Sequence, residues 1–229
     1  ALPRSFLASE SAWPVLGSLY GREMGNAVGL VTGIEADPGE DSLKAFGAAA
    51  ASSGAVGLFH IAGVTPEARM NAGKFHESAS GHRITVTPDM VADAKARLST
   101  AEKATAIDAV AIGSPHLSLE EFAQLERLLA GRRLAVPLYA CTGRHVLAVL
   151  ERDGRRKALE AAGVLIVTDT CVVVTPILPD RKGGVLMTNS GKFAHYAPAN
   201  TGYSVLYGSL AECVESAVAG RPIFMEDTA

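Results

Sequence analysis

The fold is decided by residues 107–139, which read IDAVAIGSPHLSLEEFAQLERLLAGRRLAVPLY. The apolar run at 107–112 predicts a buried strand. Ser118, followed three residues later by Glu121, is a capping box that predicts the start of a helix. After this helix, 134–139 is a second apolar run that predicts a second strand. Near-continuous apolar strands on either side of an amphipathic helix are typical of parallel strands buried on both faces.

The same alternation extends in both directions along the chain. Before this stretch we expect helices at 13–20, 41–51 and 87–98, and strands at 28–31, 56–61 and 83–86. After it we expect a helix at 142–162 that breaks near Gly154, a helix at 209–219, and strands at 164–167, 185–187 and 203–206. The sequence therefore predicts an α/β fold with mostly parallel sheets covered by helices on both faces. The linker at 99–105 predicts a boundary between a first segment, 1–103, and a second domain, 104–229.

The composition excludes several classes of protein. The 229 residues are 48% hydrophobic and 20% charged, an ordinary globular balance. The formal net charge is −3, so we expect no nucleic-acid partner. We expect no membrane span or signal peptide, since no uncharged apolar stretch reaches roughly 18–20 residues. The odd number of cysteines (Cys141, Cys171 and Cys213) indicates free thiols in a reducing compartment, the cytoplasm.

Reactive side chains follow the ends of four predicted strands, in loops at 113–116, 141–145, 169–171 and 188–196. These loops contribute hydroxyls, thiols, imidazoles, a carboxylate and a lysine. Because ligands of parallel sheets usually lie beyond the carboxyl ends of the strands, we expect all four loops along one edge of one sheet. Residues 62–84, rich in Gly, His and charge, predict a further surface or functional loop.

Each candidate side chain also has a structural interpretation. His116 could pack its loop, and Cys141 is expected to be a buried, inert thiol. Cys213 lies on the apolar stripe of the last helix and could belong to the core. For Cys171, which follows Asp-Thr after a strand, a functional and a structural role both remain open.

The segment Asn189-Ser190-Gly191-Lys192 predicts a cradle for a phosphate or a carboxylate, since it offers accessible donors and a positive charge. In the alternative interpretation, Ser190 caps a helix and Lys192 is solvated. Walker A, dinucleotide-binding, nucleophile-elbow and His-Glu-x-x-His motifs are missing from the sequence. The loops therefore carry the functional signal without a nucleotide or hydrolase motif.

These loops and the segments around them resemble the catalytic large region of aconitase X, a branch of the aconitase superfamily. The resemblance rests on residues 5–7, 12–17, 48–56, 59–60, 63–68, 113–118, 169–171, 190–192, 194–196, 208–209 and 213. It implies an aconitase-like three-layer α/β/α fold and an iron-dependent lyase that removes water from a small hydroxy acid, cis-3-hydroxy-L-proline. The alternatives are dehydration of a phosphorylated mevalonate within the same family, or a non-catalytic subunit or fragment.

The resemblance further implies a cofactor and partners. The cofactor would be an iron–sulfur cluster, of the two-iron, two-sulfide type, or a mononuclear iron, with Cys171 and then Cys213 as ligands. The family's large region is longer, so the chain resembles its C-terminal half. The N-terminal half and a small swivelling domain would be the missing partners, and the chain alone is expected to be inactive. Some relatives carry Cys where this chain has Ser114.

Removing a proton next to a carboxylate builds negative charge on that carboxylate, so fixed donors there would stabilise the transition state. We therefore expect substrate contacts from Ser114, Thr170, Asn189, Ser190 and Lys192. The catalytic residues are expected to be His116, Ser190 and His195, with the two histidines flanking the cradle as hydrogen-bond donors or proton carriers.

Overall fold

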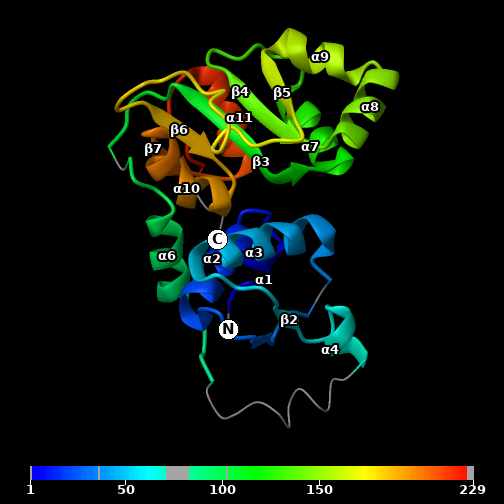
Figure 1. The fold of residues 1–229 in the computed structure, drawn as a ribbon, viewed down its shortest axis with the longest axis vertical. Coiled ribbons are helices and arrows are strands. Elements are labelled where there is room, and N and C mark those ends of the chain that lie inside the picture. Colours follow the sequence, from blue (N-terminus) through cyan, green and yellow to red (C-terminus); the bar gives the residue numbers. More distant parts are fainter. Residues whose placement is uncertain (1, 36, 71–82, 102, 226–229) are drawn as a thin grey trace. The chain divides into compact units, whose positions relative to one another are not determined.

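The computed structural model describes residues 2–35, 37–70, 83–101 and 103–225. The chain divides into two compact units, Ala1–Ala94 and Lys95–Ala229, and Figure 1 labels the elements of each. The division falls inside helix α6 (Pro88–Arg97), a few residues before the boundary expected in the linker. Among these described residues, no helix is long and apolar enough to cross a membrane.

The first unit pairs two long helices with a short parallel sheet. Its elements are α1 (Arg4–Ala8), α2 (Ala12–Met24), β1 (Leu30–Val31), α3 (Gly39–Gly54), β2 (His60–Ile61) and α4 (Pro66–Met70). Glycines allow α2 and α3 to touch, because a Cβ on Gly54 would overlap the Gly21 carbonyl. Phe46 lies in the centre of the apolar cluster, with ring centroids 6.4 Å from Trp13 and 4.8 Å from Phe59.

The strands of the first unit are shorter than the sequence predicts. Within 28–31 only the last two residues pair, and Val28 is 57% exposed. Within 56–61 only the last two residues pair, and Leu58 is 51% exposed. The strand expected at 83–86 is wrong, since these residues adopt no strand and run directly towards α6. An apolar sequence alone does not make a long strand. In the described part of this unit, each segment has only a two-residue partner strand.

The loop expected at 62–84 is partly helical. Its residues Pro66–Met70 form α4, and residues 71–82 lie outside the described residues.

The second unit contains a five-stranded, wholly parallel sheet. Its strands are β3 (Ala109–Leu117), β4 (Leu138–Thr142), β5 (Val164–Thr168), β6 (Val185–Thr188) and β7 (Ser204–Tyr207), in the order β5-β4-β3-β6-β7. Its helices are α7 (Leu119–Leu129), α8 (Arg144–Arg152), α9 (Arg155–Ala162), α10 (Gly191–Thr201) and α11 (Leu210–Ala219). The chain builds outward from β3 to β5, then returns to β6 on the other side of β3. The strand order therefore reverses between β3 and β6, the place where ligands of open parallel sheets bind.

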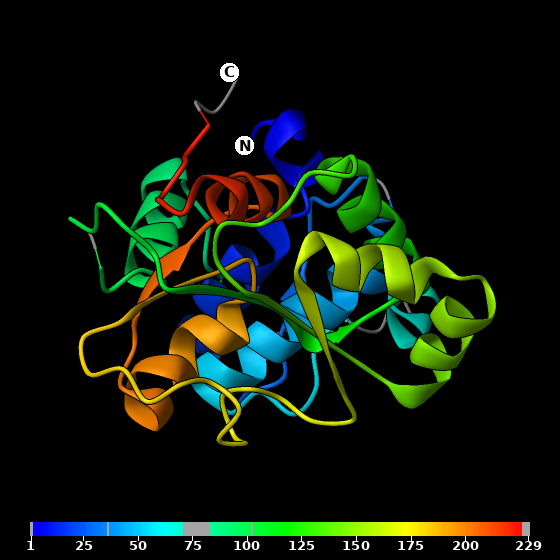
Figure 2. The same cartoon turned by 90° about the horizontal axis from the view of Figure 1, so that it is seen from above.

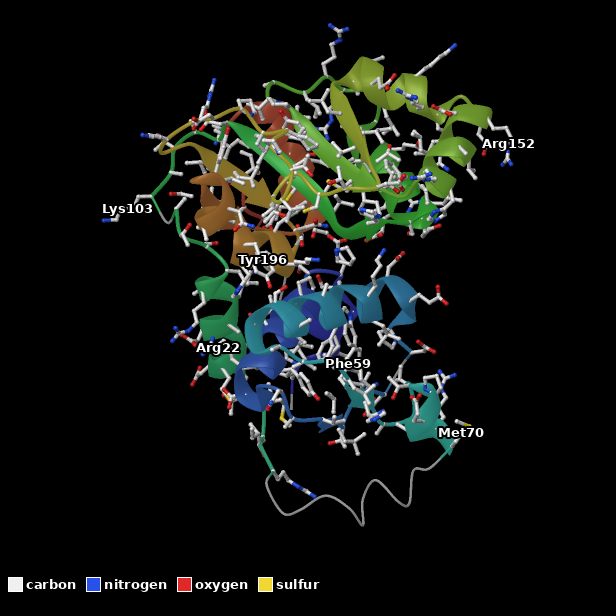
Figure 3. All side chains as sticks on the ribbon, in the orientation of Figure 1. Arg22, Phe59, Met70, Lys103, Arg152 and Tyr196 are labelled. Carbon is white, nitrogen blue, oxygen red and sulfur yellow. The ribbon has the colours of Figure 1, made fainter. Side chains whose placement is uncertain are left out.

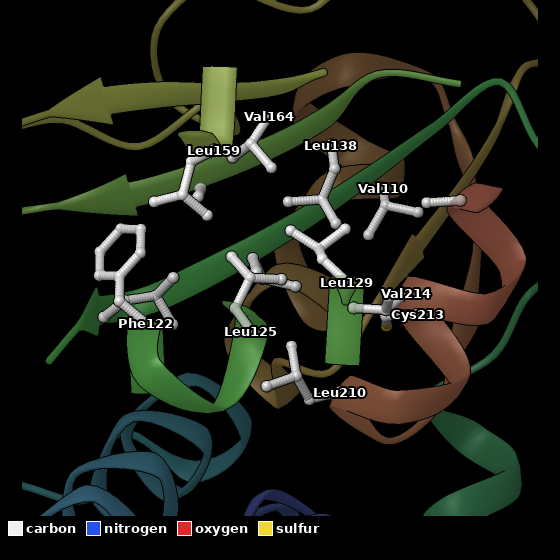
Figure 4. Packing of buried hydrophobic residues seen from close by; sticks show 14 of the residues in the cluster. Val110, Phe122, Leu125, Leu129, Leu138, Leu159, Val164, Leu210, Cys213 and Val214 are labelled. Carbon is white, nitrogen blue, oxygen red and sulfur yellow. The ribbon is translucent and has the colours of Figure 1, made fainter. Parts of the chain in front are cut away.

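A large apolar cluster of this unit lies on one face of the sheet. A row of side chains in register crosses all five strands: Val164, Leu138, Val110, Met187 and Leu206. All of them are buried beneath helices α7, α8, α9 and α11, as the close-up in Figure 4 shows for part of the cluster. Figure 2 shows α10 (orange) and α11 (red) on opposite sides of the strands. The α/β fold with helices on both faces, predicted from the sequence, is confirmed.

In the second unit, the structure confirms the helix start and the helix break that the sequence predicts. The Ser118 hydroxyl accepts the Glu121 N–H at 3.1 Å, and the helix predicted at 142–162 does break, with Gly154 left-handed at the start of α9. Thr100 is hydrogen-bonded to the edge strand β7, since its N–H donates to the Val205 carbonyl at 2.7 Å and its hydroxyl accepts the Val205 N–H at 2.8 Å. The start of the linker, residues 99–101, is therefore held against β7.

Candidate functional site

The predicted strand-end loops lie along one edge of the five-stranded sheet. Because β3, β4, β5 and β6 are parallel, their carboxyl ends meet there. The register between β3 and β4 jumps from Ile112–Ala140 to Leu117–Thr142. Four residues of β3, 113–116, therefore face a single residue of β4, and this bulge presents Ser114 and His116 at the edge.

Gly113 makes the bulge possible. Its φ of 89° lies in the left-handed region, and a Cβ there would overlap the backbone of Cys141 in the neighbouring strand. Only glycine satisfies both conditions without displacing β4.

Cys171 and Ser114 lie together at the edge. Cys171 is half-buried, and its thiol points towards the Ser114 hydroxyl with Sγ and Oγ 3.9 Å apart. Ser114 is itself buried, at 5% exposed. The structure thus brings together the thiol that the sequence analysis ranked first as a metal ligand and a serine that it expected to contact the substrate.

Cys141 lies beside Cys171 but is fully buried, as expected. Burial raises the pKa of the Cys141 thiol to about 12, and a hydrogen bond from the Val172 backbone opposes the shift. This thiol remains protonated near neutral pH and so packs rather than reacts.

A second cluster joins the ends of β4 and β5. Asp169, in the left-handed region at φ 57°, accepts the Arg144 backbone N–H at 2.9 Å and the Arg144 Nε at 2.6 Å. The backbone N–H and then the guanidinium of Arg144 hold the pKa of the Asp169 carboxyl below its usual range. The sequence analysis included both residues in the strand-end loops but gave neither a catalytic, binding or metal-ligating role. Arg144 does stand directly after a strand end, which was the available signal.

His116 and Thr170 also lie close together. The His116 Nε2 is 3.3 Å from the Thr170 carbonyl, and the ring is exposed at the edge. The Thr170 hydroxyl shares a hydrogen bond of 2.5 Å with Thr175. The imidazole is thus held against the turn that carries Cys171.

Ser190 has the structural role that the sequence analysis kept as its alternative. It is the N-cap of α10, accepting the Phe193 N–H at 3.1 Å, and its hydroxyl donates to the Ser114 carbonyl. Ser190 is 6% exposed and its only hydrogen is already donated. Asn189 beside it is half-buried, and Lys192 is exposed at the first turn of α10.

Two further predicted site residues lie on α10 and α11. The exposed His195 ring contacts Tyr196, with centroids 4.7 Å apart and the rings nearly perpendicular, and Figure 3 labels Tyr196 on α10. Cys213 is 0% exposed in the core on α11, next to Val214 in Figure 4. The structure therefore does not bring Cys213 to the edge with Cys171, because the apolar stripe of its helix turns it into the core.

The edge can supply a thiol and a hydroxyl to a metal, and an imidazole, an arginine and a lysine to an anionic ligand. Within the described ranges, no group of three or more His, Cys, Asp or Glu side chains is placed to hold a metal ion. The described side chains of the edge therefore do not by themselves form a complete metal site.

Alkylation should separate the three thiols of the iron-free protein. Cys171 is half-buried, whereas Cys141 and Cys213 are fully buried. With iodoacetamide at about pH 8, we expect one adduct on the native protein, at Cys171, and three after denaturation. Peptide mass spectrometry reads the positions. Labelling of Cys141 or Cys213 as fast as Cys171 would contradict their burial.

Family models and curated relatives of this chain point to the same protein family. The family model described as the aconitase X second domain matches residues 4–96, and the aconitase X third domain matches residues 107–219. A cis-3-hydroxy-L-proline dehydratase of Pseudomonas aeruginosa is 42% identical over 93% of this chain and 37% of its own length. A phosphomevalonate dehydratase large subunit of Methanothermobacter thermautotrophicus is 37% identical over 87% of this chain and 48% of its own length.

A solved structure agrees with the sequence relatives. The crystal structure of Thermococcus kodakaraensis aconitase X, in its holo-form, superposes with a TM-score of 0.77 at 28% identity, over 92% of this chain and 52% of that chain. The chain thus spans from about a third to about half the length of the proteins it matches. The two family models together account for nearly all of it, and the chain belongs to the aconitase X family, of which it carries the second and third domains.

Proposed function

We propose that the full-length protein containing this chain is an iron-dependent hydro-lyase that removes water from cis-3-hydroxy-L-proline. The observation that carries the proposal is the Cys171 thiol against the Ser114 hydroxyl, at the edge where the strand order reverses. The 42% identity to a cis-3-hydroxy-L-proline dehydratase supports this substrate. The second candidate substrate is phosphomevalonate, favoured by the 37% identity to a phosphomevalonate dehydratase large subunit.

The donor chemistry of the edge fits an iron centre in part. Cys171 would provide a soft thiolate, which suits iron, and Ser114 places a weaker oxygen ligand beside it. A further ligand would come from Cys213 only if α11 rearranged, so a ligand from the rest of the full-length protein is the simpler proposal. Iron bound there, as a two-iron cluster or a single ion, would supply a Lewis acid for the leaving hydroxyl.

The chain's own residues would bind and orient the substrate. Lys192, exposed at the first turn of α10, supplies positive charge, and Asn189 and Thr170 supply hydrogen-bonding groups. His116, whose Nε2 lies 3.3 Å from the Thr170 carbonyl, would act on the substrate as a hydrogen-bond donor or a proton carrier. Ser190 acts by fixing the bulge through the Ser114 carbonyl, while His195 would reach the substrate from the exposed side of α10.

The proposed activity needs more than this chain. Catalysis requires groups held on both sides of the substrate, and the chain spans 37% of the bacterial relative. We propose that the missing N-terminal part and a small swivelling domain complete the site. The three free thiols fit an enzyme of the reducing cytoplasm.

The test is turnover by the full-length protein, reconstituted with iron under anaerobic conditions. We expect loss of one water from cis-3-hydroxy-L-proline, read by mass spectrometry, and no turnover by the 229-residue chain alone. Consumption of phosphomevalonate in its place would establish the second candidate. A folded, iron-loaded protein that dehydrates neither acid would contradict the proposal and favour a non-catalytic subunit.

A further inference from the structure

We infer that Arg144 binds the carboxylate of the substrate through the free end of its guanidinium, and that Asp169 is the positioning residue that aims it. This inference rests on the proposed function, since it names the group that recognises the acid. It also explains recognition without the Ser190 hydroxyl, whose hydrogen is already donated to the Ser114 carbonyl.

Arg144 occupies the right place. It is the first residue of α8, directly after β4, so it stands at the same edge as Cys171 and His116. Its side chain is 82% exposed, although its Nε is hydrogen-bonded. A cation that is both fixed and accessible at a strand-end edge is suited to an anionic ligand.

The hydrogen bonds of Arg144 determine which atoms remain for a ligand. Asp169 takes the backbone N–H with Oδ1 and the Nε with Oδ2. Among the residues that the structure describes, neither terminal nitrogen of the guanidinium has a hydrogen-bond partner. These two nitrogens form the parallel pair of donors that matches the two oxygens of a carboxylate.

The turn that holds Arg144 also carries the candidate metal ligand. Asp169 is a non-glycine residue at φ 57°, a conformation that L-residues rarely adopt, and its N–H donates to the Thr142 carbonyl at 2.9 Å. Two residues later comes Cys171. The strained turn therefore fixes the guanidinium relative to the thiol, which is what orienting a substrate between an anchor and a metal requires.

A surface ion pair would look similar but would behave differently. Exposed ion pairs contribute little to stability, so a purely structural Arg144–Asp169 pair predicts nearly unchanged kinetics when it is broken. Arg152, at the other end of α8, provides the matched control, since it too is exposed and pairs with a neighbouring aspartate.

The experiment compares Arg144→Ala, Arg144→Lys and Arg152→Ala in the full-length, iron-loaded enzyme. We expect Arg144→Ala to raise the KM for the acid about 10–100-fold, the effect of losing hydrogen bonds between charged groups. Arg144→Lys should recover only part of this loss, because an ammonium cannot form the paired contact. Arg152→Ala should leave the KM unchanged.

The carboxamide analogue of the acid gives a readout that a structural role would not change. The wild-type enzyme should prefer acid over amide, and Arg144→Ala should lose most of that preference. Asp169→Asn should weaken the preference less, since it loosens the guanidinium without removing it.

The outcomes separate the two proposals. Absence of turnover in the wild-type enzyme overturns the proposed function. Wild-type turnover of either acid, with the same KM and the same acid preference in Arg144→Ala as in Arg152→Ala, overturns the role of Arg144 alone. Circular dichroism checks folding, and Arg144→Lys decides the question if Arg144→Ala does not fold.

Discussion

Replacing Cys171 with serine in the full-length protein should remove bound iron and dehydration activity together. The thiol is half-buried at the edge, with its Sγ 3.9 Å from the Ser114 Oγ. Serine preserves the size of the side chain, but a hydroxyl is a much poorer ligand for iron than a thiolate. Changes beside a metal ligand already cost about 10–100-fold, so loss of the ligand itself should cost at least about 100-fold in turnover.

The controls are Cys141→Ala and Cys213→Ala, measured for iron content and turnover in the same preparation. Both thiols are fully buried, and alanine avoids leaving a hydroxyl without a partner. We expect these variants to lose some stability and to keep their iron. Full iron occupancy in folded Cys171→Ser would remove Cys171 from the site. Iron loss confined to Cys213→Ala would restore Cys213, the second ligand implied by the family resemblance.

Replacing Gly113 with alanine should strongly destabilise the folded protein. The new Cβ would overlap the Cys141 backbone, and φ at this position is 89°. Overpacking and a left-handed non-glycine residue each cost about 1–3 kcal/mol, so we expect a loss on the order of 3 kcal/mol or more in the free energy of unfolding. Urea denaturation followed by circular dichroism measures it.

Gly131→Ala separates the two contributions. Gly131 has a φ of 74°, but an added Cβ would meet nothing within 4 Å. It should therefore show the backbone cost alone, roughly 1 kcal/mol. Equal losses in the two variants would show that the close approach of β3 to β4 is not rigid.

The sequence predicted the second unit well because its signals are local. The apolar run at 107–112, the Ser118 capping box and the break at Gly154 each act within a few residues. The same approach overestimated the length of the strands in the first unit. Segments 28–31 and 56–61 are apolar, but only two residues of each pair with the other. Strand length depends on the partner strand, which local sequence does not contain.

The site was predictable in outline and less so in detail. Parallel strands imply one shared edge, so the loops of Ser114, His116 and Cys171 could be grouped before the structure was known. The helix cap at Ser190 was among the interpretations of the sequence. The hydrogen bonds of Ser190 to Ser114 and of Asp169 to Arg144 could not be predicted, because these partners lie far along the chain. Cys213 lies in the core, as the apolar stripe of its helix indicated, whereas the family resemblance implied a metal ligand at this position.

Anomalous diffraction at the iron edge, from crystals of the iron-loaded full-length protein, tests the central claim most directly. The claim is that the carboxyl-end edge of the sheet at β3 and β6, where the strand order reverses, is the metal-dependent active site of a dehydratase. The predicted result is an iron peak within bonding distance of the Cys171 Sγ and next to Ser114. An iron peak elsewhere in the protein, with none at this edge, would contradict the account.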